Sequence, residues 1–126
     1  MSFLFDENLS QAIVIALRAH GEPLHHVREL FPASTPDETL FRFLADRAWC
    51  LVSRDLRITR NPQQRHAILE AGIGAFFFTG RASRSAFKMT MFVFERWEEI
   101  KAFADAERRP FICAVPDRGR LHRLDG

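Results

Sequence analysis

The sequence predicts an α/β fold in which a mainly parallel β-sheet is covered by helices. Short apolar runs alternate along the chain with longer segments of helical periodicity, and this alternation is typical of parallel strands joined by helices. It continues without a repeat, a low-complexity stretch or a linker. The chain has 126 residues, enough to bury a core, so residues 1–126 are expected to form one domain.

The N-terminal part of the chain is expected to hold a strand, a helix and a second strand. Ser2–Phe5 is a short apolar run that predicts the first strand. A helix is expected from Asn8 to about His20, and because Val14 and Ile15 are both apolar it should be covered on more than one side. His25–Leu30 has room for a short second strand.

The next segment begins with residues that are typical of a helix N-terminus. Thr35 is expected to be the N-cap, Pro36 to take the first helical position and Glu38 to complete a capping box. Cys50–Ser53 follows this helix and predicts a strand that ends at Arg54.

The second half continues the alternation of helices and strands. Asn61–Ala71 predicts a helix, and Ser85–Ala104 predicts the longest one. Ile73–Thr79 is rich in phenylalanine without polar alternation, which predicts a central strand buried on both faces. Phe111–Val115 predicts the last long strand, and Arg120–Leu124 fits an edge hairpin.

The apolar runs, the N-terminus and the cysteines indicate a soluble cytoplasmic protein. No apolar run reaches the ~20 residues of a membrane span, and the N-terminus lacks the basic region of a secretory signal. Cys50 and Cys113 lie in apolar runs outside any metal-ligand pattern, so buried free thiols in a reducing cytosol are expected.

His25 and His26 are adjacent and point to opposite faces of a strand, so both are expected to be structural.

The charges are unevenly spread along the chain. The net charge is +2 overall, but residues 1–53 carry −3 and residues 54–126 carry +5. An acidic front half and a basic back half suit a site that holds a cation and attracts a polyanion, although many solvated surfaces are equally lopsided.

Two carboxylates come directly after predicted strands. Asp6 follows the first strand and Asp55 follows Cys50–Ser53. If those strands are neighbours, both side chains lie on the sheet edge where open α/β sheets bind ligands, roughly 5 Å apart by strand spacing. Two carboxylates at that separation favour a cation between them, and an oxygen-only site favours Mg²⁺ or Mn²⁺. The alternative is that each is an ordinary turn residue.

Asp37 is the candidate for a third oxygen ligand, placed by a helix start that faces the same edge. At the second position of the predicted helix its charge also suits the helix dipole, so stabilisation of the helix alone explains it. Glu38 is explained in the same way by the capping box.

Arg54, Arg57, Arg60 and Arg65 form a basic run in the segment that leaves the proposed site. In one interpretation they guide a nucleic-acid backbone past the metal. In the other they belong to a solvated arginine-rich loop.

Taken in order, these motifs resemble a known family. Phe5–Leu9 after a short strand, Pro36–Glu38 opening a helix and Ser53–Asp55 after another strand are similar in order and spacing to the PIN-like domains of VapC-type toxins. Arg60–Pro62 and Gly72–Phe77 also look like a branch of that superfamily. The resemblance spans nearly the whole chain, and its specificity lies in the ordered set.

The resemblance implies a three-layer α/β/α, Rossmann-like PIN domain with endoribonuclease activity that depends on Mg²⁺ or Mn²⁺. Asp6, Asp37 and Asp55 would then form the acidic cluster, with Glu7 and Glu38 as second-tier acids. The implied partners are an RNA substrate and the cognate antitoxin of a type II toxin–antitoxin pair, and a homodimer is also compatible.

One departure from the pattern concerns the fourth acid. Such domains commonly place it shortly after the third, whereas residues 56–59 of this chain, Leu-Arg-Ile-Thr, hold none. A second metal position is therefore in doubt. Arg57 could substitute for the acid at the phosphate, or the protein could be a catalytically inactive PIN-like binding module.

A receiver-like phosphoacceptor domain is the alternative from another class. It would use Asp6 and Glu7 as its acidic pair, Asp55 as the acceptor and Thr79 as the hydroxyl. A receiver also needs a lysine after its last strand, and here Pro116 follows instead.

Overall fold

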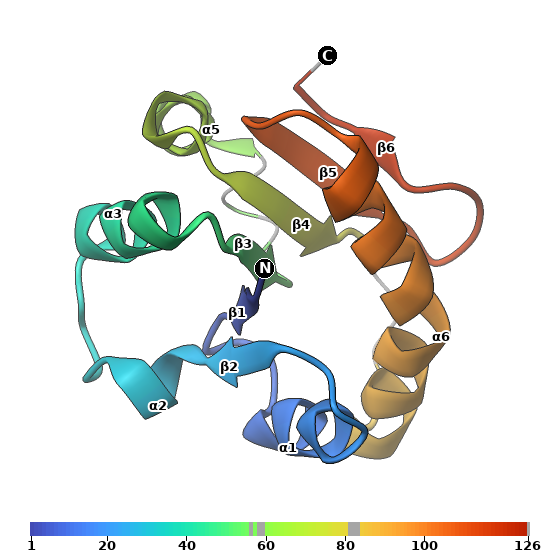
Figure 1. Cartoon of the computed structure of the whole chain (residues 1–126). Coiled ribbons are helices and arrows are strands. Elements are labelled where there is room, and N and C mark those ends of the chain that lie inside the picture. Colours follow the sequence, from blue (N-terminus) through green and yellow to red (C-terminus); the bar gives the residue numbers. More distant parts are fainter. Residues whose placement is uncertain (56, 58–59, 81–83, 126) are drawn as a thin grey trace.

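The computed structural model describes residues 1–55, 57, 60–80 and 84–125. In it a six-stranded sheet with the order β2-β1-β3-β4-β5-β6 forms the centre of the molecule (Figure 1). The strands are β1 (Phe3–Phe5), β2 (Leu24–His26), β3 (Cys50–Ser53), β4 (Gly74–Phe78), β5 (Phe111–Val115) and β6 (His122–Arg123). The helices are α1 (Gln11–Ala19), α2 (Val27–Leu30), α3 (Asp37–Arg47), α5 (Pro62–Ala71) and α6 (Ala86–Ala106).

The first five strands are parallel, and β6 pairs antiparallel with β5 at one edge. The chain moves from β1 to β2 on one side and then returns to place β3 on the other side of β1. Phe5 pairs with both His26 and Val52, so the carboxyl ends of β1, β2 and β3 lie level. The change of direction at β1 is the position at which doubly wound sheets bind ligands.

Helices cover both faces of the sheet, which gives the three layers that the resemblance to PIN-like domains implies. Alternate strand residues divide between two apolar clusters. One cluster joins Phe5, Val52 and Phe76 to α1 and α6, and the other joins Leu51 and Phe77 to α3 and α5. All five residues of β4 are buried between β3 and β5, as predicted for the phenylalanine-rich segment.

The crossover through α6 differs in hand from the others. The connections from β2 to β3 through α3 and from β3 to β4 through α5 run in one direction across the sheet, and both helices lie on the same face. The connection from β4 to β5 through α6 runs in that same direction, but α6 lies on the other face, beside α1 (Figure 1). The β4–α6–β5 crossover therefore has the hand opposite to that of the other parallel connections, which is rare. It places α1 and α6 side by side, both beginning after the carboxyl ends of strands.

Helix α1 starts later than the sequence predicts. The segment from Asn8 is a turn, and Ser10 is the N-cap because its hydroxyl accepts the Ala12 N–H at 3.1 Å. The expected cover on more than one side is also wrong at one position, since Val14 is buried but Ile15 is exposed.

The predicted capping box at the start of α3 is also wrong. Pro36 is the N-cap and has no side-chain capping bond, so Asp37 takes the first helical position instead of the second. The Thr35 hydroxyl donates backwards to the Pro32 carbonyl at 2.7 Å and is not available as a cap. Glu38 consequently has no capping partner at this helix end.

The predicted second strand is shorter and lies earlier than His25–Leu30, since β2 ends at His26 and Val27–Leu30 forms α2, whereas the remaining elements agree closely with the expectations. Cys50–Ser53 and the helix after Asn61 have the predicted bounds, and β6 pairs with β5 as the edge hairpin. Cys50 and Cys113 are buried free thiols. Within the described part of the chain, no helix is both long and apolar enough to cross a membrane.

Candidate active site

Asp6 and Asp55 lie on the same rim of the sheet, at the carboxyl ends of two neighbouring strands. The backbone N–H of Asp6 donates to the Val52 carbonyl at 2.9 Å, which continues the β1–β3 ladder one residue past β1. Asp55 follows β3 two residues after Ser53. The adjacency that the sequence argument requires is therefore present.

The buried hydroxyl of Ser53 connects the two aspartates. It lies 3.1 Å from Asp6 Oδ2 and 3.4 Å from Asn8 Oδ1, and its oxygen accepts the backbone N–H of Asp55 at 3.0 Å. Asn8 Oδ1 also accepts the Arg54 N–H at 3.1 Å. These contacts fix the loop after β1 against the loop after β3.

The remaining oxygen of Asp6 is also bonded, and the carboxyl is largely withdrawn from water. Its Oδ1 accepts the Glu7 N–H at 2.8 Å. Burial raises the pKa of Asp6 above its usual value, the Ser53 hydrogen bond opposes that rise, and the nearby charge of Asp55 adds to it. The charge of Arg28 also opposes the rise, but the net shift is upward, so an ionised Asp6 is costly here without further positive charge.

Asp37 belongs to the same electrostatic cluster although it comes from a different helix. Burial raises its pKa, and the charges of Asp6 and Asp55 raise it further. The start of α3 therefore faces the rim where Asp6 and Asp55 lie, so the structure brings together carboxylates from three distant parts of the sequence.

Asp55 is neutralised by its own loop. The Arg57 guanidinium donates Nε to Oδ1 and Nη2 to Oδ2, both at 3.0 Å. This fork holds the pKa of Asp55 below its usual value, despite partial burial. Arg57 itself is 91% exposed, so nothing packs its side chain in this position. Of residues 56–59, where no fourth acid occurs, Arg57 alone lies within the described part of the chain.

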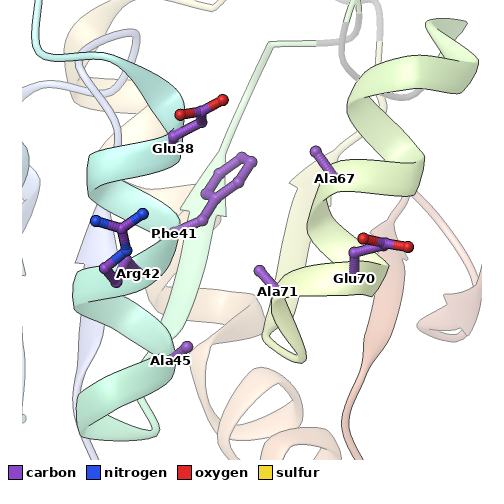
Figure 2. Close-up of a pocket in the computed structure, with 7 residues that line it drawn as sticks. All are labelled: Glu38, Phe41, Arg42, Ala45, Ala67, Glu70 and Ala71. Atoms are coloured by element: carbon purple, nitrogen blue, oxygen red, sulfur yellow. The ribbon is translucent and has the colours of Figure 1, made fainter.

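The two second-tier acids lie elsewhere. Glu7 forms an ion pair with Arg28 and is largely exposed. Glu38 lines a groove of about 440 Å³ between α3 and α5, beside Phe41 and across from Ala67 (Figure 2). Neither glutamate is among the charges that shift the pKa of Asp6, Asp37 or Asp55.

The predicted basic track divides into two parts. Arg57 and Arg60 line an open hollow of about 680 Å³ together with Asn61 and the start of α5. Arg65 is directed to the C-terminal segment, where Nη2 donates to the Leu124 carbonyl at 2.7 Å. Arg54 is half-buried between Ser53 and Asp55.

The adjacent histidines are structural, as expected. His26 is buried, its Nδ1 accepts the Arg28 N–H at 3.1 Å, and its Nε2 lies 2.7 Å from the Leu9 carbonyl, which fixes the Nε2–H tautomer. Together with Glu29 it forms a capping box for α2. His25 stacks on Trp49, with ring centroids 4.9 Å apart.

Comparison with known families agrees with this geometry. A family model described as a PIN like domain matches residues 1–80, which hold β1 to β4 and all three clustered aspartates. This chain belongs to the PIN-like domain family. Neither the curated proteins nor the solved structures include a match to it. The fold of a PIN-like domain is of the nuclease type, and the receiver-like interpretation is left without support.

The oxygen donors at the rim suit a hard divalent cation better than any other metal. Asp6, Asp37 and Asp55 supply carboxylates, of which Asp55 raises the pKa of the other two, and the Asn8 amide oxygen lies beside Asp6 at Ser53. In their present positions, no three His, Cys, Asp or Glu side chains within the described ranges are arranged to ligate one ion. The residue types of this PIN-like domain therefore fit Mg²⁺ or Mn²⁺, while Asp55 would have to release Arg57.

Ser53 and Asn8 are the site residues that sequence reasoning missed. Both look unremarkable in the sequence, since Ser53 ends an apolar strand and Asn8 lies in a turn. The signal that could have identified Ser53 is its position: it is a hydroxyl residue that ends a fully buried strand, two residues before Asp55.

Proposed function

We propose that this PIN-like domain is a Mg²⁺- or Mn²⁺-dependent endoribonuclease that hydrolyses RNA phosphodiesters. The observation that supports it most is the shared electrostatic cluster of Asp6, Asp37 and Asp55 on the ligand-binding rim of a nuclease-type fold. The pKa values of Asp6 and Asp37 are both raised, in part by the charge of Asp55, so keeping these carboxyls ionised without a cation is costly and a structural role alone explains them poorly.

In this proposal Asp6 and Asp55 would hold the cation directly, and Asp37 would ligate it through water or orient the attacking water. A divalent ion bound there would lower the pKa of a coordinated water and neutralise charge on the phosphate. Ser53 acts through Asp6 as a positioning residue, because its hydroxyl fixes one carboxylate oxygen.

Arginines beside the rim would bind the RNA backbone. Arg57 and Arg60 border the open hollow next to Asp55, and guanidinium groups form forked hydrogen bonds with phosphates. If a metal took the place of Arg57 at Asp55, the guanidinium would be free to bind a substrate phosphate. Arg54 is the next candidate, whereas the bond to Leu124 makes Arg65 the weakest of the four.

We propose the biological role from the resemblance to VapC-type toxins. The chain would be the toxin of a type II toxin–antitoxin pair, with the antitoxin encoded by a neighbouring gene. Co-expression with the products of adjacent open reading frames, followed by a growth assay, tests this role separately from the catalytic one.

The catalytic proposal is tested with a ribonuclease assay in Mg²⁺ or Mn²⁺. Asp6→Asn, Asp37→Asn and Asp55→Asn are each expected to lower the rate by at least about a hundredfold, since even groups that only support a metal ligand contribute about 10- to 100-fold. Asp46→Asn is the matched control, because Asp46 is an exposed aspartate near the opposite end of α3. Equal cleavage by all five proteins would end the proposal.

A catalytically inactive PIN-like binding module is the second candidate. It is favoured by the fork between Arg57 and Asp55, which occupies both oxygens of a proposed ligand. Calorimetric titration with Mn²⁺ separates the two candidates. A metal-dependent enzyme should release or absorb heat on binding Mn²⁺, and Asp6→Asn should abolish this signal. An inactive binding module should show no such signal in the wild type.

A further inference from the structure

The outer face of α6 carries an apolar stripe that its own chain covers only at one end, where the His20 ring lies edge-on to Phe94 with ring centroids 6.0 Å apart. Phe87, Met91 and Phe94 are 73%, 50% and 37% exposed, although all three are large and hydrophobic. Their spacing of four and then three residues places them on one side of the helix. Among the described residues six large hydrophobic side chains are this exposed, and half of them form this stripe.

The stripe is separate from the core-facing side of the same helix. Met89, Val93, Trp97 and Ile100 are buried against the sheet and α1. At about 100° per residue, Phe87, Met91 and Phe94 point to the opposite side. In Figure 1 the first half of α6 lies at the border of the molecule beside α1. The stripe is thus an outward helix face with the residue spacing of a helix–helix contact.

The charged residues beside the stripe indicate what covers it. Lys88 and Glu95 are exposed and lie seven residues apart, so they occupy the same flank two turns from each other. Within the described part of the chain neither of them forms an ion pair. One flank therefore carries a positive charge at one end and a negative charge at the other.

We infer that this face binds a second copy of the chain through an antiparallel pair of α6 helices. A twofold axis near residues 91 and 92 places Lys88 of each copy opposite Glu95 of the other, and it packs the two stripes together. A parallel pair would instead place this flank against the opposite flank of the partner helix, so Lys88 and Glu95 would not meet each other. The charge pattern is self-complementary in the antiparallel arrangement alone.

The stripe also differs from the groove between α3 and α5. That groove has a phenylalanine and alanines on its floor and charges of both signs on its rim, and nothing in the structure shows what would fill it. On α6 the exposed apolar stripe and the flanking charges both fit the same partner, which is the α6 helix of a second copy packed in the antiparallel direction.

The test measures molar mass by light scattering and sedimentation over a micromolar concentration series. The monomer has a mass of 14.6 kDa, and a concentration-dependent rise to twice this value is expected for the wild type. Met91→Glu places a charge at the centre of both stripes and should weaken dimerisation at least about a hundredfold. A wild type that stays monomeric throughout the series overturns the inference, and so does a dimer that Met91→Glu leaves intact.

Charge reversal tests the antiparallel arrangement at exposed positions that the fold does not need. Lys88→Glu and Glu95→Lys should each weaken the dimer by about tenfold, because each opposes like charges twice. Mixing these two variants should restore a mixed dimer, and the double variant should dimerise like the wild type. Loss of the dimer in the double variant overturns the antiparallel pairing.

A cross-linking arm distinguishes the two orientations directly. Met91→Cys lies near the twofold axis and should form an intermolecular disulfide under mild oxidation, whereas Phe87→Cys should not. Efficient cross-linking of both variants indicates a parallel pair and overturns the proposal. All substituted residues are exposed or half-exposed, so each variant is expected to fold, and circular dichroism checks this. The ribonuclease activity is not involved in any of these readouts.

Discussion

Replacing Ser53 by alanine tests the connection between the loops that carry the aspartates. The hydroxyl has one proton, which goes to Asp6 at 3.1 Å in preference to Asn8 at 3.4 Å because the carboxylate is charged. Its oxygen accepts the Asp55 N–H at 3.0 Å, and the side chain is fully buried, so water cannot replace either bond. A hydrogen bond to a charged group contributes about 1.5–3 kcal/mol and a neutral one about 0.5–1.5 kcal/mol, so Ser53→Ala should lower the free energy of unfolding by about 2–4 kcal/mol.

Denaturant unfolding measures this loss, and Ser85→Ala is the matched control. Ser85 caps α6 from an exposed position, where its hydroxyl accepts the Lys88 N–H at 3.2 Å, and loss of such a cap costs about 1 kcal/mol. Since the Ser53 hydrogen bond lowers the pKa of Asp6, the substitution should also raise that pKa further, which carboxyl-carbon NMR can follow. A loss no larger than that of Ser85→Ala, with the Asp6 titration unchanged, would refute the reasoning.

Three further substitutions examine the cluster and the core. Asp55→Asn should lower the pKa of Asp37 towards 3.8, because one of the charges that raise it is removed, and an unchanged NMR titration would show that the two carboxyls do not interact. Arg57→Ala should tighten Mn²⁺ binding a few-fold in calorimetry, since it frees both oxygens of Asp55, and an unaltered affinity would mean that the fork does not compete with metal. Gly74→Ala should cost at least about 1–3 kcal/mol in thermal unfolding, because the added methyl meets the ring of Phe111 in the middle of the sheet, and full stability would show that this contact can relax.

Much of the fold could be predicted because hydrophobic patterning and helix boundaries are local. Cys50–Ser53 is a continuous apolar run, and the helix after Asn61 has its N-cap and its closing glycine within the sequence itself. The adjacency of β1 and β3 was only a condition of the sequence argument, and the observed strand order meets it, which places Asp6 and Asp55 on one rim.

The errors occur where side chains make bonds that the sequence does not reveal. Thr35 has the right spacing for a cap, but the preceding turn, with Ser34 at a φ of 69°, directs its hydroxyl to Pro32. Asn8 has good helical neighbours, yet its side chain bonds the loop after β3 and keeps the segment out of α1. His26 caps α2 although histidine is an uncommon N-cap. Each case depends on a partner that only the folded chain supplies.

The unusual crossover through α6 has an electrostatic consequence for the rim. It gives the α1 face a second helix that starts near the carboxyl ends of the strands, opposite α3 and α5 on the other face. The first turns of α1, α5 and α6 contain no acidic side chain and are capped by the neutral side chains of Ser10, Asn61 and Ser85, so each helix N-terminus keeps a partial positive charge of roughly half a unit. Helices on both faces of the sheet thus begin on the side where the parallel strands end, and this fixed positive background would persist after every arginine of the loop had been replaced.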